Sequence, residues 1–224
     1  KGIGKRKRET ARRGKLRGIG FSAYIEACGL APSQAVGALG GGVGQWESCE
    51  VRVNPTGSVE VLVGSHAHGQ GHETTFAQVV SDRLGIPIDT VTIVHGDTDK
   101  VQFGMGTYGS RSGAVGLTAI LKAMEKVEAK AKKIAAHQLE ASENDIVIEN
   151  GEFKVAGTDK SLAFPMVALA AYTAHNLPDG MEPGLKESAF YDPTNFTFPA
   201  GAYICELEVD PGTGKTSFVN FVAA

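Results

Sequence analysis

Glycine is the feature of this sequence that most constrains its fold. The chain has 29 glycines among 224 residues, about 13%, which is nearly twice the average usage of ~7%. These glycines follow no three-residue period, so a collagen-like helix is excluded. They gather between short apolar segments, at places where a tight turn or a ligand needs close approach of the backbone. The pattern predicts short strands and helices joined by glycine-rich loops.

Apolar alternation and helical spacing predict the elements themselves. The predicted hairpins pair residues 45–53 with 58–63 across Asn54-Pro-Thr-Gly57, 145–149 with 152–156 across Asn150-Gly151, and 202–209 with 215–222. A strand is predicted over 91–95, and helices over 73–84, 113–140 and 164–174. Helices mixed with hairpins indicate an α+β fold with mixed sheets and packed helices, rather than a regular doubly wound sheet.

The charge of the chain is unevenly distributed. Residues 1–17 hold nine Lys or Arg and one acid, net +8, whereas the remainder holds 13 basic and 24 acidic residues, net −11. The basic stretch has no aromatic residue that could stack on a base, so we interpret it as a solvated lead-in helix and expect no nucleic-acid partner. The rest, 18–224, is predicted to be one functional region, with residue 141 as the candidate point of a further division.

Cysteine content and hydropathy bear on the compartment. The three cysteines, Cys28, Cys49 and Cys205, form no CxxC pair, which argues against a disulfide framework and favours a reducing compartment. No run approaches the ~20 apolar residues of a membrane helix, and the first residues lack the apolar region of an export signal. We therefore expect a cytoplasmic location and no membrane-spanning segment. The apolar end of the chain suggests that the sequence is a piece of a longer one.

Two loops concentrate polar residues among glycines. In the first, Gly69 and Gly71 flank Gln70, so backbone amides can approach a ligand while the side chain offers a donor and an acceptor. The helix that begins near His72 would present free N–H groups to a phosphate. The second loop, residues 96–112, contains four glycines, and we expect it to be mobile without a ligand because ordering costs ~1–2 kcal/mol per residue.

Two other functions stay open at this point. His66, His68 and His72 could be the zinc ligands of a hydrolase, although Phe76 stands where an HExxH helix would carry its second histidine. The chain could also be a binding or assembly module that holds no cofactor.

Several segments of the chain resemble the molybdenum hydroxylase family. They are Gly69-Gln-Gly-His-Glu-Thr-Thr-Phe-Ala-Gln78, Gly104-Met-Gly-Thr-Tyr-Gly-Ser-Arg-Ser112, Tyr24-Ile-Glu-Ala-Cys-Gly29 and Asn195-Phe-Thr-Phe-Pro-Ala200. Their order and spacing are similar to those in the large subunits of aerobic carbon monoxide dehydrogenase and its relatives, and the similarity extends along essentially the whole chain. The resemblance implies an internal fragment of the molybdopterin-binding region of a larger subunit.

The resemblance also implies a cofactor and its contacts. The cofactor would be molybdopterin cytosine dinucleotide with molybdenum. The implied cofactor-binding residues are Gly69, Gln70, Gly71, His72, Thr107, Tyr108, Gly109, Ser110 and, as a phosphate partner, Arg111. No catalytic residue and no protein ligand to a metal is assigned, because the loop that carries a copper-binding cysteine and the Gly-Glu-Gly-Gly segment with the catalytic glutamate are both missing here.

The implied reaction is oxidation of a small substrate (carbon monoxide, an aldehyde or a heterocycle) with oxygen derived from water. Electrons would pass to a small iron-sulfur subunit with [2Fe-2S] clusters and a medium subunit with FAD. We expect the isolated chain to be inactive.

Overall fold

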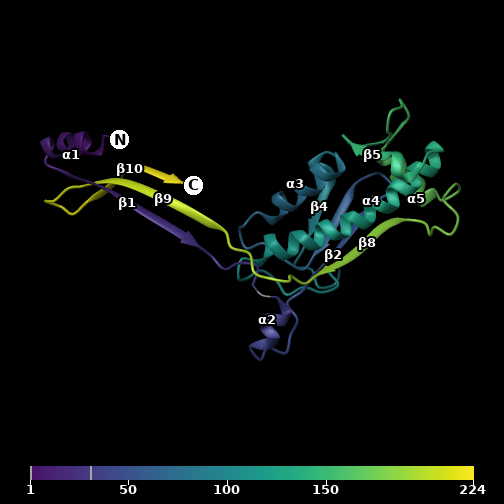
Figure 1. The fold of residues 1–224 in the computed structure, drawn as a ribbon, viewed down its shortest axis with the longest axis horizontal. Coiled ribbons are helices and arrows are strands. Elements are labelled where there is room, and N and C mark those ends of the chain that lie inside the picture. The colour runs from purple at the N-terminus through teal and green to yellow at the C-terminus, as the bar shows by residue number, and fades with distance from the viewer. Residues whose placement is uncertain (1, 31) are drawn as a thin grey trace. The chain divides into compact units, whose positions relative to one another are not determined.

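The computed structural model describes residues 2–30 and 32–224, and the chain forms two compact units (Figure 1). One unit combines both ends of the chain, up to Ala27 and from Thr197. The other unit is the continuous segment Cys28–Phe196. Whether a further division lies near residue 141 stays a prediction.

The unit made from the chain ends is a helix on a three-stranded sheet. Helix α1 (Ile3–Arg12) precedes strand β1 (Leu16–Ile25), which pairs antiparallel with β9 (Ala200–Val209). Strand β10 (Thr216–Ala223) pairs with the other edge of β9, which gives the order β1-β9-β10. The final hairpin is therefore confirmed. Helix α1 covers residues 3–12 of the stretch that we interpret as a lead-in helix, whereas β1 was not predicted as a strand.

Helix α1 is attached to its sheet by ion pairs. Arg6 of α1 donates to Glu206 over 2.7 Å, and Arg17 of β1 donates to the same carboxylate over 2.9 Å. Arg13 and Thr10 hydrogen-bond to Glu208, and the hydrogen bond from Arg13 contributes most to lowering the pKa of that carboxyl. Part of the basic charge is thus paired with the sheet rather than solvated.

A four-stranded sheet forms the centre of the second unit. Its strands are β2 (Glu47–Val53), β3 (Val59–Val63), β4 (Val91–Val94) and β8 (Leu185–Tyr191), in the order β4-β3-β2-β8. The predicted β2–β3 hairpin is confirmed. Strands β3 and β4 are parallel, and the connection between them is the helix α3 (His72–Leu84), which ends at Gly85 with φ 66°.

Helices cover one face of this sheet (Figure 1). The long helix α4 (Leu117–Leu139) packs on β2 and β8, and α3 packs on β4. In β2 the inward residues are buried, whereas Glu50 and Arg52 face outward and form ion pairs, so the sheet is apolar on one face only. The predicted helix over 113–140 is confirmed, although its first turn, Ser112–Gly116, is a π-helix.

The remaining elements of the second unit pack mainly around helix α4. A second sheet is formed by β5 (Ile146–Glu149), β6 (Glu152–Val155) and β7 (Ser161–Ala163), and α5 (Phe164–Thr173) packs on α4. A short helix, α2 (Ser33–Ala38), and 3-10 turns over Ile88–Thr90 and Glu143–Asp145 complete the unit. The α+β class is confirmed, and β7, β8 and α2 were not predicted. Among the described residues, no helix is both long and apolar enough to cross a membrane.

Candidate functional site

The two polar loops begin at the same end of the central sheet. The first follows β3 and leads into α3, and the second follows β4 and leads into the π-helical turn before α4. Because β3 and β4 are parallel neighbours, their carboxyl ends lie at one edge of the sheet, where ligands of α/β proteins commonly bind. The topology therefore brings together two segments that lie about 30 residues apart in the sequence.

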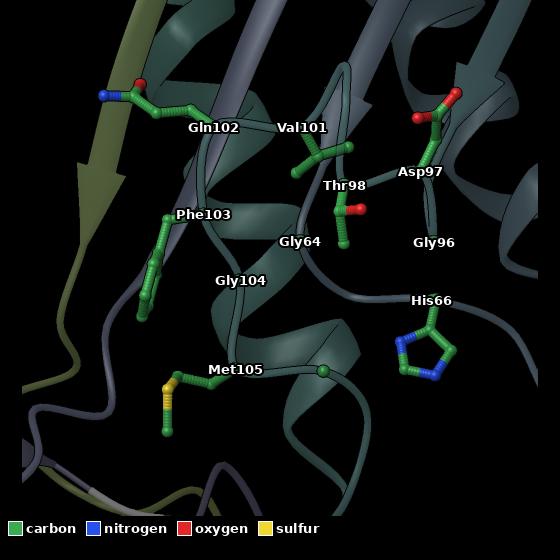
Figure 2. Close-up of a pocket in the computed structure, with 11 residues that line it drawn as sticks. Gly64, His66, Gly96, Asp97, Thr98, Val101, Gln102, Phe103, Gly104 and Met105 are labelled. Atoms are coloured by element: carbon green, nitrogen blue, oxygen red, sulfur yellow. The ribbon is translucent and has the colours of Figure 1, made fainter.

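The loops cross in direct backbone contact at two glycines. A Cβ atom on Gly64 would lie 2.3 Å from Cα of Gly104, and one on Gly104 would lie 2.2 Å from Cα of Gly64. Figure 2 shows the two segments side by side, with Phe103 and Met105 on one side of the crossing and His66 on the other. A cavity of about 630 Å³ is lined by residues on both sides of this contact. Only glycine fits at either position.

Later residues of the same two loops form a second cavity of about 470 Å³. It is lined by Gln70, His72, Thr107, Tyr108, Gly109, Ser110, Ser112 and Gly113. Six of these eight are among the predicted cofactor-binding residues. The lining offers hydroxyls, an amide, an imidazole and backbone groups, and it contains no carboxylate. We call this cavity the two-loop cavity.

The start of α3 contributes unprotected backbone to this region. Gly71 is the N-cap, with φ 76°, and no side chain caps the helix. The amides of Thr74 and Thr75 bond to the carbonyl oxygen of Gly71 over 3.1 Å. A Cβ atom on Gly69 or Gly71 would have no neighbour within 4 Å, so this turn of backbone is open. The N–H groups of the first helical residues can therefore bind an anion.

His72 is a buried polar group with an unsatisfied atom. Its side chain is 8% exposed and stacks on Phe76 with the ring centroids 5.0 Å apart. Its Nδ1 atom has no hydrogen-bond partner. Burial lowers the pKa of His72, and a hydrogen bond to the backbone of His66 opposes that shift. A neutral, buried imidazole with a free nitrogen suits a polar group of a ligand.

Hydroxyl groups connect the second loop to its surroundings. Thr107 Oγ1 donates to the carbonyl oxygen of His66 and lies 2.8 Å from Ser112 Oγ. The hydroxyl of Tyr108 donates to Gln45 Oε1. The Thr107 and Tyr108 hydroxyls are thus engaged within the protein. Gln70 is exposed, and its Oε1 accepts a hydrogen bond from the backbone N–H of His68.

The fold and these loops are those of a known family. The family described as "Molybdopterin cofactor-binding domain" matches residues 2–224. The chain belongs to this family.

Relatives of this molybdopterin cofactor-binding domain include carbon monoxide dehydrogenases. The chain is 45% identical to the carbon monoxide dehydrogenase large chain of Hydrogenophaga pseudoflava over 93% of its own length, and 42% identical to that of Afipia carboxidovorans over 98%. It spans 26% and 27% of those two relatives.

Solved structures agree with these sequence relatives. Carbon monoxide dehydrogenase from Oligotropha carboxidovorans superposes with a TM-score of 0.85 at 41% identity, over 98% of this chain and 27% of that one. Quinoline 2-oxidoreductase from Pseudomonas putida 86 superposes with the same TM-score at 36% identity, over 99% of this chain and 28% of that one. The expected similarity to the molybdopterin-binding region of molybdenum hydroxylase large subunits is confirmed, over about a quarter of the length of those relatives.

Arg111, the predicted phosphate partner, is bonded to groups of the protein itself. Its side chain is fully buried and forms an ion pair of 3.0 Å with Glu47, which is also fully buried. Its remaining hydrogen bonds go to backbone carbonyl oxygens, including that of Gly106 at 2.9 Å. Contact of Arg111 with a phosphate stays a prediction.

The histidines do not form the cluster that a zinc hydrolase requires. The rings of His66 and His68 lie edge to face with centroids 4.4 Å apart, and His72 stacks on Phe76 instead. Over residues 2–30 and 32–224, no three His, Cys, Asp or Glu side chains are placed to hold a metal ion. The arrangement on which the zinc alternative depends is therefore not present.

Sequence reasoning missed Glu47 and Ser65. Both are fully buried, and Ser65 Oγ donates to Glu47 Oε2 over 2.8 Å. The sequence contained one signal for Glu47. Alternate residues of a strand face the same side of a sheet, so Glu47 lies on the same face of β2 as the buried residues Cys49 and Val51.

Proposed function

We propose that this domain binds molybdopterin cytosine dinucleotide with molybdenum, as part of the large subunit of a carbon monoxide dehydrogenase-like oxidoreductase. The observation that carries the proposal is the two-loop cavity. Six predicted contact residues from two separate loops line it, and its lining contains no carboxylate. Family membership supports the molybdopterin part, and the cytosine dinucleotide form rests on the resemblance of the loop sequences.

The residues present fit such a group. The open backbone at Gly69 and Gly71 and the free N–H groups of α3 would hold phosphate oxygens. The unsatisfied Nδ1 of His72 and the exposed amide of Gln70 would bond to polar atoms of the ligand. The Thr107 and Tyr108 hydroxyls already have protein partners. The second loop would therefore contact the cofactor through the backbone groups of residues 107–110. When bound, the cofactor supplies the redox chemistry of oxidative hydroxylation.

The substrate and the partner subunits belong to the same proposal. Among the relatives, one is a carbon monoxide dehydrogenase large chain and another a nicotine 6-hydroxylase large subunit, which supports carbon monoxide or a heterocycle as the substrate class. An aldehyde is the third substrate that we propose. We propose a medium subunit with FAD and a small subunit with [2Fe-2S] clusters as electron acceptors. The absence of a CxxC pair in this sequence is consistent with iron-sulfur clusters on another chain. We propose that the complex is cytoplasmic.

Replacement of Gln70 tests the site. In the full-length subunit within its complex, Gln70→Ala should reduce bound pterin, measured as its fluorescent oxidation product, and released cytidine monophosphate. The melting temperature should hardly change, because the Gln70 side chain is exposed. Gln78→Ala, an exposed glutamine further along α3, is the matched control.

Two outcomes would count against the proposal. A large drop in melting temperature with normal pterin content would show that Gln70 is structural. An active complex that contains no molybdenum would instead favour the cofactor-free binding or assembly module.

A further inference from the structure

The central unit contains a buried carboxylate that the proposed function does not use. Glu47 lies at the first position of β2, on the face that packs against the core, and its side chain is fully buried. Removing a carboxylate from water is costly unless its oxygens find partners. The partners of Glu47 therefore indicate what its placement achieves.

Those partners come from both polar loops. Glu47 Oε2 accepts hydrogen bonds from Arg111 Nη1 over 3.0 Å and from Ser65 Oγ over 2.8 Å. Glu47 Oε1 accepts from the backbone N–H of Ser48 over 3.1 Å. Ser65 belongs to the loop after β3, whereas Arg111 ends the loop after β4. A single carboxylate thus joins the two loops that form the two-loop cavity.

Arg111 extends the connection along the second loop. Its Nη1 also donates to the carbonyl oxygen of Gly106 over 2.9 Å, and its Nη2 donates to those of Gln45 and Trp46 over 2.8 and 3.3 Å. The guanidinium therefore fixes the backbone of residues 106–111 to the chain that enters β2. Ser48 Oγ reinforces this by donating to the carbonyl oxygen of Phe103.

The space around this cluster is filled. A Cβ atom on Gly64 would lie 2.1 Å from Glu47 Oε1, and one on Gly116, in the π-helical turn, would lie 2.7 Å from Ser65 Oγ. The crossing of the loops and the start of α4 thus pack directly on Glu47 and Ser65. Any displacement of the carboxylate would move both loops.

We propose that Glu47 is the positioning residue of the cofactor site, acting through Arg111 and Ser65 to order residues 64–72 and 103–111 before the cofactor arrives. This inference rests on the proposed function for the identity of the ligand. The ordering itself is a property of the cofactor-free protein. For residues 103–111, we therefore expect an ordered loop instead of the mobile loop predicted from its glycine content.

Amide hydrogen exchange of the full-length subunit, produced in a host that makes no molybdopterin, tests the inference. Both loops should be protected in the wild type. In Ser65→Ala, which keeps the ion pair and removes one hydrogen bond, exchange should rise several-fold, up to about tenfold, in residues 103–111 as well as in 64–72. In Glu47→Gln the rise should be larger in both loops. Glu60→Gln, which breaks the half-exposed pair with Arg52 on the outer face of the sheet, is the matched control.

A double variant separates positioning from bulk stability. Glu47→Gln alone leaves the Arg111 charge buried and unpaired, which lowers stability or prevents folding. Glu47→Gln with Arg111→Met removes both charges, so the melting temperature should recover while both loops still exchange rapidly. If loop protection recovers together with the melting temperature, Glu47 has a merely structural role and the inference is overturned.

Cofactor content distinguishes the failure of this inference from the failure of the proposed function. Unprotected loops in the cofactor-free wild type, or a Ser65→Ala effect confined to residues 64–72, would refute positioning even if the loaded subunit contains pterin. Loops that loosen as expected in a subunit that never binds pterin would refute the proposed function and leave the positioning role intact.

Discussion

Replacement of Gly64 by alanine should separate the two site loops. The new Cβ atom would lie 2.3 Å from Cα of Gly104, 2.8 Å from the carbonyl oxygen of Phe103 and 2.1 Å from Glu47 Oε1. Non-bonded carbons prefer ~3.5–4.0 Å, so the two backbones must move apart by roughly 1.2–1.7 Å. Two of the three clashes are with backbone, which cannot rotate away as a flexible side chain can.

The magnitude follows from what that movement disrupts. Overpacking of a well-packed site costs about 1–3 kcal/mol. Displacement of the Glu47 carboxylate also weakens its buried ion pair with Arg111, and breaking such a pair costs about 3–5 kcal/mol. A local loss of at least about 3 kcal/mol is therefore expected, which corresponds to a roughly 150-fold rise in the rate of exchange through local opening.

Amide exchange followed peptide by peptide is the direct assay. The rise should be confined to residues 45–53, 64–72 and 103–111, and the hairpin at residues 146–155 should be unchanged. Gly37→Ala is the matched control, because a Cβ atom there has no neighbour within 4 Å and alanine favours the helical backbone of α2. Exchange in Gly64→Ala that stays within about threefold of the control would refute the close packing inferred at the crossing.

Three other changes have definite expected results. Because burial lowers the pKa of His72 below its ordinary 6.5, the unfolded chain gains this proton at a higher pH than the folded chain does; stability should therefore decrease as the pH falls through about 6.5, and less so in His72→Gln, as thermal unfolding would show. Glu208→Gln should speed exchange in α1 at neutral pH, since the hydrogen bond from Arg13 lowers the pKa of that carboxyl; a difference from the wild type that persists below the lowered pKa would contradict this cause. Tyr172→Phe removes a 2.6 Å hydrogen bond to the carbonyl oxygen of Val53 and should cost about 1 kcal/mol in urea unfolding, whereas an unchanged midpoint would show that water replaces it.

The sequence predicted those elements whose structure depends on interactions between residues near each other in the chain. The Asn150-Gly151 pair adopts φ values of 51° and 75°, so the β5–β6 hairpin follows from residues that tolerate this backbone. Gly85 ends α3 for the same reason. Strand β8 was missed because it lies in a proline-rich stretch and its partner, β2, is far away in the sequence. A pairing of that kind is decided by the packing of the whole sheet.

The candidate site divides in the same way. Its glycine-flanked Gln70 and the helix start at His72 were predicted from short patterns, whereas the meeting of the two loops depends on the parallel pairing of β3 and β4. The prediction that residues 96–112 are mobile was based only on their glycines and their few apolar side chains. That prediction did not include the hydrogen bonds that Arg111 donates to backbone far away in the sequence, because those bonds form only when β2 is in place. For residues 96–102 the expectation of mobility stays a prediction.

An anchored second loop also agrees with what tight retention of a cofactor requires. Residues 103–111 are nine residues, and ordering them only on binding would cost on the order of 9–18 kcal/mol. A nanomolar complex has a net binding free energy of about −12 kcal/mol, so if that cost arose on binding the contacts would have to supply roughly 21–30 kcal/mol to reach the same affinity. The bonds of Glu47, Ser65 and Arg111 place the ordering cost in folding, where burial of the core offsets it. Under the proposed function, the cofactor then meets loops that are already in position.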